Sequence, residues 1–421
     1  MKADRREFLK GSLAGLSSFA AGTKVHARAA ETTSTEAQIA TFVADVTPSV
    51  GDPLGLGLSP SVSVIEHPLL AKGVILRDAG GTYVLCSLDW ECVCNDAYEL
   101  FRQRIAEAAG TSPSRVAVQN IQQHTAPGID SNASQILEKA TGAPADRELK
   151  LLDAATAKTA AAVHQATGRW RRLTRVGLSW AAVDQVASSR RILQPDGTIL
   201  ARLSSTKDPE QQRAPEGYID AYLRTISFYD GETPLVNMHY YATHPQSYYG
   251  DGRVTYDVPG IARERLEKES GVFQVYFSGC GGDIAMGKYN DGSPARRSVL
   301  VGRLYDAMVR SLQKVHVEPL SPMVWRTAEV RFPLRSDPSF SEEANRKVLH
   351  DTTSTVDARV KAACNLSMIE RVHAGRHFEL SCLAMGSIRI LHLPGEPFIE
   401  FQLWAEMCAR TSSWQSPPSG I

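Results

Sequence analysis

The sequence predicts an α/β fold in which mixed central β-sheets are flanked by helices. Two observations predict it: apolar runs of strand length alternate with amphipathic helix patterns, and four of these runs end in loops rich in His, Asp, Glu and Gly. In open α/β sheets, ligands lie beyond the carboxyl ends of the strands. We therefore expect these four loops to converge on one site.

The first half of the chain provides two of the strands and the helix between them. Residues 83–88 form an apolar run that ends at Asp89, a helix pattern follows over residues 96–110, and residues 116–121 predict the next strand. That strand leads into the polar group Gln122-Gln123-His124-Thr125. We expect this group to lie at a strand end.

The second half repeats this order three times. The predicted strands are residues 235–238, 273–277 and 388–393, and the predicted helices are residues 257–271, residues 298–315 and a last helix from about Phe398. Each strand is followed by a polar loop. These loops contain His244, the glycine cluster from Gly279 to Asp283, and Glu396.

The amino terminus resembles an export signal. Arg5 and Arg6 precede a mildly apolar stretch, residues 11–22, and Ala27-Arg28-Ala29 offers a cleavage site of small residues. The apolar stretch is too short to span a bilayer. We expect residues 1–29 to be a twin-arginine signal peptide that directs export to the periplasm or beyond, leaving no stable membrane span after cleavage.

No linker or repeat divides the rest of the chain. We expect residues 30–405 to form one domain and residues 406–421 to form an irregular tail. With 46 basic and 46 acidic side chains the net charge is zero, which argues against a nucleic-acid partner and favours a small or neutral substrate. The seven cysteines are spread along the chain and indicate buried thiols rather than a disulfide framework or a metal cluster.

Three of the strand-end residues could bind a metal. His124, His244 and Glu396 supply two imidazoles and one carboxylate, a common zinc shell that leaves a fourth position open. No local spacing joins them, and a polar His at a strand end is more often a hydrogen-bonded loop residue. The residues alone favour that plainer interpretation.

A resemblance to a known family changes this balance. Short motifs from Val43 to Glu400 resemble, in order and approximate separation, those of the catalytic domain of neutral, non-lysosomal ceramidases. These motifs are Asp45-Val46-Thr47-Pro48, His67-Pro68-Leu69, Ser87-Leu88-Asp89, Tyr241-Ala242-Thr243-His244-Pro245 and Leu393-Pro394-Gly395-Glu396. The resemblance implies the ceramidase-like domain fold, and it implies that His244 and Glu396 are zinc ligands.

The chain departs from the family at two positions that would take part in the chemistry. Gln122 stands where the family has its first zinc-binding histidine, and an amide oxygen binds zinc less well than an imidazole does. His124 lies two positions along the same predicted strand face, so we expect it to bind the metal or to polarise a substrate oxygen. Ala285 replaces the family's nucleophilic serine, and metal-activated water must then attack instead.

Two further residues complete the predicted catalytic set. Arg190 in Ser189-Arg190-Arg191 resembles an Asn-Arg motif that holds substrate, with a surface salt bridge as the alternative. Asp283 lies in the glycine cluster beside Ala285. The N–H groups of that cluster could bind an oxyanion, or its glycines could simply form a turn. The family's late tyrosine ligand has no counterpart, since Tyr305 is the last tyrosine before Ile421, and truncation or a frameshift would explain this.

These residues support three hypotheses of function. The first is a zinc-dependent hydrolase of an amide or related bond that acts on a small-molecule, lipid or glycan substrate. The second is an inactive or truncated paralogue that binds a lipid or glycan without cleaving it. The third is unrelated chemistry, because a fold does not determine a function.

Overall fold

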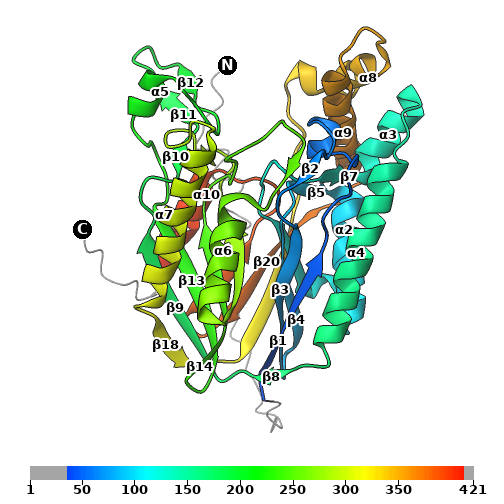
Figure 1. The fold of residues 1–421 in the computed structure, drawn as a ribbon. Coiled ribbons are helices and arrows are strands. Elements are labelled where there is room, and N and C mark those ends of the chain that lie inside the picture. Colours follow the sequence, from blue (N-terminus) through cyan, green and yellow to red (C-terminus); the bar gives the residue numbers. More distant parts are fainter. Residues whose placement is uncertain (1–35, 412–421) are drawn as a thin grey trace.

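A computed structural model gives the structure of residues 36–411 of the 421-residue chain. The predicted signal peptide, residues 1–29, and residues 412–421 of the predicted tail lie outside the described residues. In the described part, two five-stranded sheets and a three-stranded sheet form the centre, and helices cover the outer faces (Figure 1).

The first five-stranded sheet has the strand order β6-β4-β3-β1-β8. Its strands are β1 (Gln38–Asp45), β3 (Leu70–Asp78), β4 (Gly81–Leu88), β6 (Val116–Asn120) and β8 (Arg171–Arg172). Only β4 and β6 pair in parallel, and helix α2 (Asn95–Ala109) crosses between them. Ala97, Phe101 and Ile105 lie four residues apart and place one buried face of α2 on the sheet.

The second five-stranded sheet has the order β16-β14-β13-β9-β18. Its strands are β9 (Arg175–Ala182), β13 (Tyr222–Asp230), β14 (Thr233–Tyr241), β16 (Phe273–Ser278) and β18 (His316–Pro319). The parallel strands β14 and β16 are joined through α6 (Asp257–Ser270). Helix α7 (Pro294–Leu312) begins with Ser293 as its cap and Pro294 in its first turn.

A third, antiparallel sheet leads to the end of the described chain. It consists of β19 (Met323–Val330), β20 (Phe378–Met385) and β21 (Ile388–His392). The remaining helices are α3 (Ser131–Thr141), α4 (Asp146–Ala166), α5 (Pro209–Arg213), α8 (Glu342–His350), α9 (Val356–His373) and α10 (Ile399–Thr411).

Short strands pair within the loops between the larger elements. They are β2 (Val64–Ile65), β5 (Cys92–Cys94), β7 (Gly128–Asp130), β10 (Ser188–Ser189), β11 (Arg191–Leu193), β12 (Ile199–Ala201), β15 (Arg253–Val254) and β17 (Ile284–Ala285). The pairs are β2 with β15, β5 with β7, β10 with β17 and β11 with β12.

The core is layered. One cluster lies between the first sheet and helices α2 and α4, and another lies between the second sheet and helices α6 and α7. A third joins the sheets to one another and includes Leu85, Phe228, Phe277 and Leu383. Complete burial of such a side chain contributes ~1.5–3 kcal/mol to folding. These layers fix the strand ends relative to one another.

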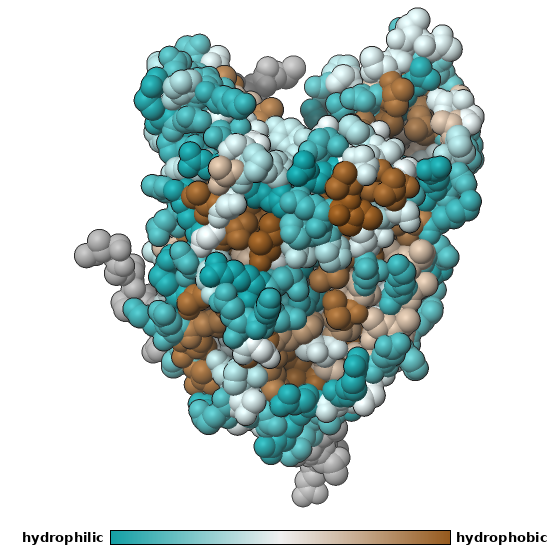
Figure 2. All heavy atoms as spheres, in the orientation of Figure 1, coloured by the Kyte–Doolittle hydropathy of each residue, from teal (hydrophilic) through white to brown (hydrophobic). Residues whose placement is uncertain are grey.

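One end of the molecule is hollowed. Figure 2 shows a notch between two lobes, and by comparison with Figure 1 these lobes carry β11, β12 and α5 on one side and α8 and α9 on the other. The short strands β5 and β7 lie on the same side of the sheets as the notch. Within residues 36–411 the structure contains no helix with the length and apolar character needed to cross a membrane.

The predicted fold class is confirmed, and the predicted strands match β4, β6, β14, β16 and β21. Two predicted boundaries were wrong. The helix expected from residue 298 begins at Pro294, because the Ser293 cap and the proline start it earlier. The tail expected from residue 406 begins as helix, because α10 continues to Thr411 through residues of good helix propensity.

Candidate functional site

Three loops that follow strand ends meet in space. Gln122 follows β6, His244 follows β14 and Glu396 follows β21. The Nε2 atom of His244 lies 3.5 Å from Oε2 of Glu396, and the Gln122 side-chain amide donates to Oε1 of Glu396 at 2.6 Å. The rings of His124 and His244 are 5.8 Å apart between centroids. The structure thus brings together the four residues predicted to bind metal.

His244 is buried and is held by the backbone. Its Nδ1 atom lies 2.6 Å from the Gly281 carbonyl oxygen and 3.1 Å from that of Ile284. Both neighbours are acceptors, so Nδ1 carries the hydrogen and donates it. With Nδ1 as the donor, Nε2 is the ring nitrogen that faces Glu396 and could bind a metal ion.

The His244–Glu396 contact joins a ring nitrogen and a carboxylate oxygen. A lone pair and a carboxylate 3.5 Å apart repel unless a proton or a cation lies between them. Partial burial of Glu396 opposes ionisation, but hydrogen bonding and charge from His244, His124 and Gln122 outweigh it and lower the pKa of Glu396. The Glu396 side chain is 52% exposed and so remains open to a ligand.

His124 is paired with Glu91, a residue that the sequence did not single out. Nδ1 of His124 lies 3.1 Å from Oε1 of Glu91, while Nε2 of His124 and Oε2 of Glu91 are buried without a hydrogen-bond partner. Burial and the charges of His244 and Arg190 lower the pKa of His124 to about 3. Burial and the charge of Glu396 raise the pKa of Glu91 to about 8. Such shifts cluster at functional sites.

Gln122 has an unusual backbone. Its φ is +65°, in the left-handed region that costs a non-glycine residue on the order of 1 kcal/mol. Strand β6 ends at Asn120, so the expectation that Gln122 and His124 share one face of a strand is wrong. The turn instead aims the Gln122 amide at Glu396. Metal binding by the amide oxygen of Gln122 stays a prediction.

Arg190 is a half-buried cation near these residues. Its Nη2 atom donates to Ser204 Oγ at 3.2 Å and to Gln246 Oε1 at 3.3 Å, and its Nε atom is buried without a partner. Burial lowers the pKa of Arg190, against the opposing charge of Glu396. Arg190 forms no ion pair within residues 36–411, so the salt-bridge alternative receives no support there.

Asp283 is buried and contacts two neighbouring segments. It forms an ion pair with Arg191, and its Oδ1 accepts a hydrogen bond from the Ile399 N–H at 3.0 Å, at the start of α10. Both oxygens are therefore already engaged. A direct catalytic role for Asp283 stays a prediction.

The glycine cluster lets two loops approach closely. A Cβ atom on Gly282 would lie 2.3 Å from the Glu396 carbonyl oxygen, and one on Gly281 would lie 3.1 Å from the Thr243 backbone. The Gly282 N–H donates to Pro397, and the Cys280 N–H donates to Gln402. These two N–H groups are already used, which favours close packing over an oxyanion role.

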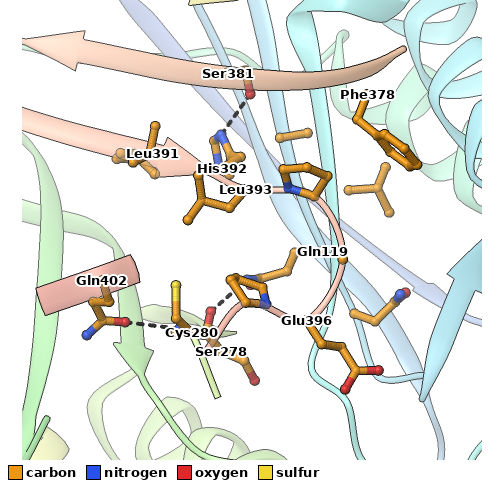
Figure 3. A pocket seen from close by; sticks show the side chains of 18 of the residues that line it. Gln119, Ser278, Cys280, Phe378, Ser381, Leu391, His392, Leu393, Glu396 and Gln402 are labelled. Atoms are coloured by element: carbon orange, nitrogen blue, oxygen red, sulfur yellow. Dashed lines mark hydrogen bonds between the residues drawn. The ribbon is translucent and has the colours of Figure 1, made fainter. Parts of the chain in front are cut away.

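A large cavity adjoins the site. Its volume is about 1810 Å³, and its lining includes His244, Glu396 and Gln122 together with the whole of β6 and β21. Figure 3 shows residues that line this cavity. Gln119, Ser278, Cys280 and Gln402 lie on one side, Phe378, Ser381 and His392 lie opposite, and Glu396 lies at one end. The cavity is larger than most small-molecule sites.

The donor atoms suit a metal of the zinc type, although they do not form a closed shell. No group of three or more His, Cys, Asp and Glu in the described part of the chain could hold a metal ion as it stands. Three candidate donor atoms nevertheless lie at the site, namely Nε2 of His244, Oε2 of Glu396 and the unpartnered Nε2 of His124. Nitrogen and carboxylate oxygen are ligands that zinc prefers.

Glu91 is the site residue that sequence reasoning missed. Glu91 lies two residues after Asp89, just past the strand predicted at residues 83–88. The other candidate site residues also lie just past predicted strands. That position was the only available signal.

Comparison with known proteins supports the fold. Neither a family model nor a curated protein matches the sequence. The structure of a neutral ceramidase from Pseudomonas aeruginosa is similar, with a TM-score of 0.60 and 14% identity over 86% of this chain and 62% of that one. A ceramidase complexed with C2 gives a TM-score of 0.65 and 12% identity, over 90% and 67% of the two chains. This chain therefore has the fold of neutral ceramidases and spans about 62% of the length of the Pseudomonas chain.

Proposed function

We propose that this protein hydrolyses an amide bond in a lipid-like substrate, with a zinc ion held by His244, Glu396 and His124. The observation that carries the proposal is the Nε2 atom of His244 facing the Glu396 carboxylate at 3.5 Å, with Nδ1 held by backbone carbonyls. A cation between Nε2 and the carboxylate could bind both. The two similar structures reported above are named as ceramidases, which supports an amide as the bond cleaved.

Water is the proposed nucleophile. Zinc supplies Lewis acidity, which polarises a carbonyl group and makes water nucleophilic near neutral pH. Ala285 is fully buried and has no hydroxyl group, and the neighbouring Ser188 hydroxyl already donates to the Ala285 carbonyl. Neither residue can attack a substrate from its present position.

Arg190 has the charge and the burial to stabilise the reaction. A half-buried guanidinium with an unpartnered Nε is suited to bind negative charge that develops on a carbonyl oxygen. Gln122 holds one oxygen of Glu396, which keeps the other oxygen directed towards His244. The chain's own residues thus orient the ligands and neutralise the charge.

The cavity supports a substrate with a long apolar part. It extends from His244 and Glu396 along β6 and β21, and its apolar lining includes Ile226, Phe378, Leu391 and Trp404. An acyl chain could lie there with its amide group at the His244 end. Burial of apolar surface would supply binding energy of about 25 cal/mol per Å².

Hydrolysis of a fluorogenic N-acyl amide by zinc-loaded protein tests the proposal. We expect turnover that a chelator abolishes, and a loss of two orders of magnitude or more, roughly the size seen for essential electrostatic groups, in His244→Ala and Glu396→Gln. Glu343→Gln, an exposed carboxylate on α8, is the matched control and should retain full activity. Equal turnover in Glu396→Gln and in the control would contradict the proposal.

A lipid-binding protein without turnover is the second candidate. Two points favour it: Ala285 stands where the resemblance implies a nucleophilic serine, and within residues 36–411 no three metal-binding side chains converge as they stand. This candidate predicts that a fluorescent fatty acyl amide binds in the cavity and is recovered uncleaved, with or without zinc.

A further inference from the structure

Glu91 is fixed in place by its surroundings. Its backbone N–H donates to the Pro127 carbonyl at 3.0 Å, and β5, which follows it, pairs in parallel with β7. A Cβ atom on Gly55 would lie 3.0 Å from Oε2 of Glu91, so the carboxylate packs directly against that backbone. The side chain of Glu91 is only 13% exposed. The Glu91 side chain is thus nearly closed off from solvent.

His124 contacts the Glu91 side chain. Its ring has one polar contact in the described residues, the 3.1 Å approach of Nδ1 to Oε1 of Glu91, and its Nε2 atom is buried without a partner. His244, by contrast, is held through Nδ1 by two backbone carbonyls. The hydrogen bond made by one ring nitrogen sets the tautomer and therefore the role of the other.

We propose that Glu91 is a positioning residue for His124. Its Oε1 atom, 3.1 Å from Nδ1 of His124, accepts the Nδ1–H, and this directs the Nε2 lone pair into the site beside His244 and Glu396. The inference rests on the proposed function for its purpose, because an oriented lone pair is useful only to a bound metal ion or substrate. Its geometry stands independently of that function.

The replacement at position 122 makes this orientation more important. Gln122 stands where the resemblance implies an imidazole ligand, and its side-chain amide donates to Glu396. His124 is then the imidazole that remains to face His244 across 5.8 Å. A ring free to rotate about its side-chain torsions would lose conformational entropy on binding, whereas a ring held by Glu91 is already oriented.

The tautomer of His124 tests the inference in metal-free protein. We would record long-range ¹H–¹⁵N spectra of histidine-labelled protein at pH 9, well above the ordinary pKa of histidine so that its rings are neutral, and assign His124 with a His124→Gln variant. The wild type should show the Nδ1–H form. Glu91→Gln, whose amide oxygen can still accept, should retain it, and Glu91→Leu should lose it. An Nε2–H form in the wild type, or an unchanged tautomer in Glu91→Leu, would overturn the inference.

Zinc affinity gives a second measurement that separates the two proposals. We expect Glu91→Leu to weaken zinc binding by roughly 10–100-fold, as loss of an outer hydrogen-bond partner does, and Glu91→Gln to restore most of the affinity. Near-ultraviolet circular dichroism confirms that both variants are folded. If the wild type binds no zinc, the proposed function fails while the tautomer result still decides the role of Glu91. If wild type and Glu91→Leu bind zinc equally, only the present inference fails.

Discussion

Asp89 and Glu91 lie two residues apart in one turn, yet their surroundings differ. Asp89 is fully buried and accepts hydrogen bonds from both terminal nitrogens of Arg263 at 2.9 Å and from the Leu70 N–H at 3.0 Å. Glu91 meets His124 through one oxygen, and its other oxygen has no partner. Buried polar groups whose hydrogen bonds are all made stabilise a fold, whereas buried groups without a partner are candidates for binding a ligand.

The same contrast separates two histidines. His239, inside the second sheet, contacts Thr225 Oγ1 at 2.8 Å through Nδ1 and Gln274 Oε1 at 2.9 Å through Nε2. His124, in a strand-end loop, leaves Nε2 unpartnered. We therefore expect residues such as His239 to act on stability and loop residues such as His124 to act on the proposed function. Substitutions in the two regions should differ in what they change.

The largest loss of stability is expected from Arg263→Met. It leaves the Asp89 carboxylate buried and unpaired, and such a change costs ~3–5 kcal/mol. Arg265→Met on the same helix is the matched control, because its pair with Glu269 is half exposed and contributes about 0–1 kcal/mol. Urea unfolding measures both. Equal losses of stability in the two variants would contradict a stabilising role for the buried Asp89–Arg263 pair.

Acid should weaken the interior through His239. Burial lowers the pKa of His239 from 6.5 to about 4, so between these pH values the unfolded chain binds more protons than the folded one. The free energy of unfolding therefore falls as the pH falls from 6.5 to 4, by ~3 kcal/mol from this residue. His239→Gln should remove that part of the slope in unfolding experiments at several pH values. An unchanged slope would show that His239 does not contribute it.

A methyl group at Gly282 should disturb the site more than the core. Its Cβ would lie 2.3 Å from the Glu396 carbonyl oxygen, so Gly282→Ala must displace the Glu396 loop at a cost of ~1–3 kcal/mol. Zinc affinity should fall as well. Gly302→Ala in α7 meets open space and should stabilise the helix by ~0.5–1 kcal/mol. Thermal unfolding measures the stability of the two variants, and calorimetry measures their zinc affinity. Equal changes in both quantities for the two variants would refute the prediction.

The smallest change in stability is expected from Glu396→Gln. The side chain is about half exposed, so the free energy of unfolding should change by no more than ~0.5 kcal/mol. Zinc binding should nevertheless be lost. A loss of stability as large as that of Arg263→Met would place Glu396 with the structural residues instead.

The alternation of apolar runs and polar loops was sufficient to predict the fold class. The expected convergence of strand-end loops holds for His244 and Glu396, but not through parallel neighbours, because β14 and β21 belong to different sheets and β21 pairs antiparallel with β20. The position of Gln122 could not be predicted, since its positive φ breaks the two-residue period of a strand. Glu91 was missed because it reaches His124 only through the pairing of β5 with β7, a contact between segments more than thirty residues apart.

Zinc titration calorimetry of the wild type, His244→Ala and Glu396→Gln tests the central claim most directly. We predict one zinc ion per wild-type chain and no binding at this site in either variant. Zinc binding by both variants with unchanged stoichiometry and affinity, or none by the wild type, would contradict the shared site of these two residues.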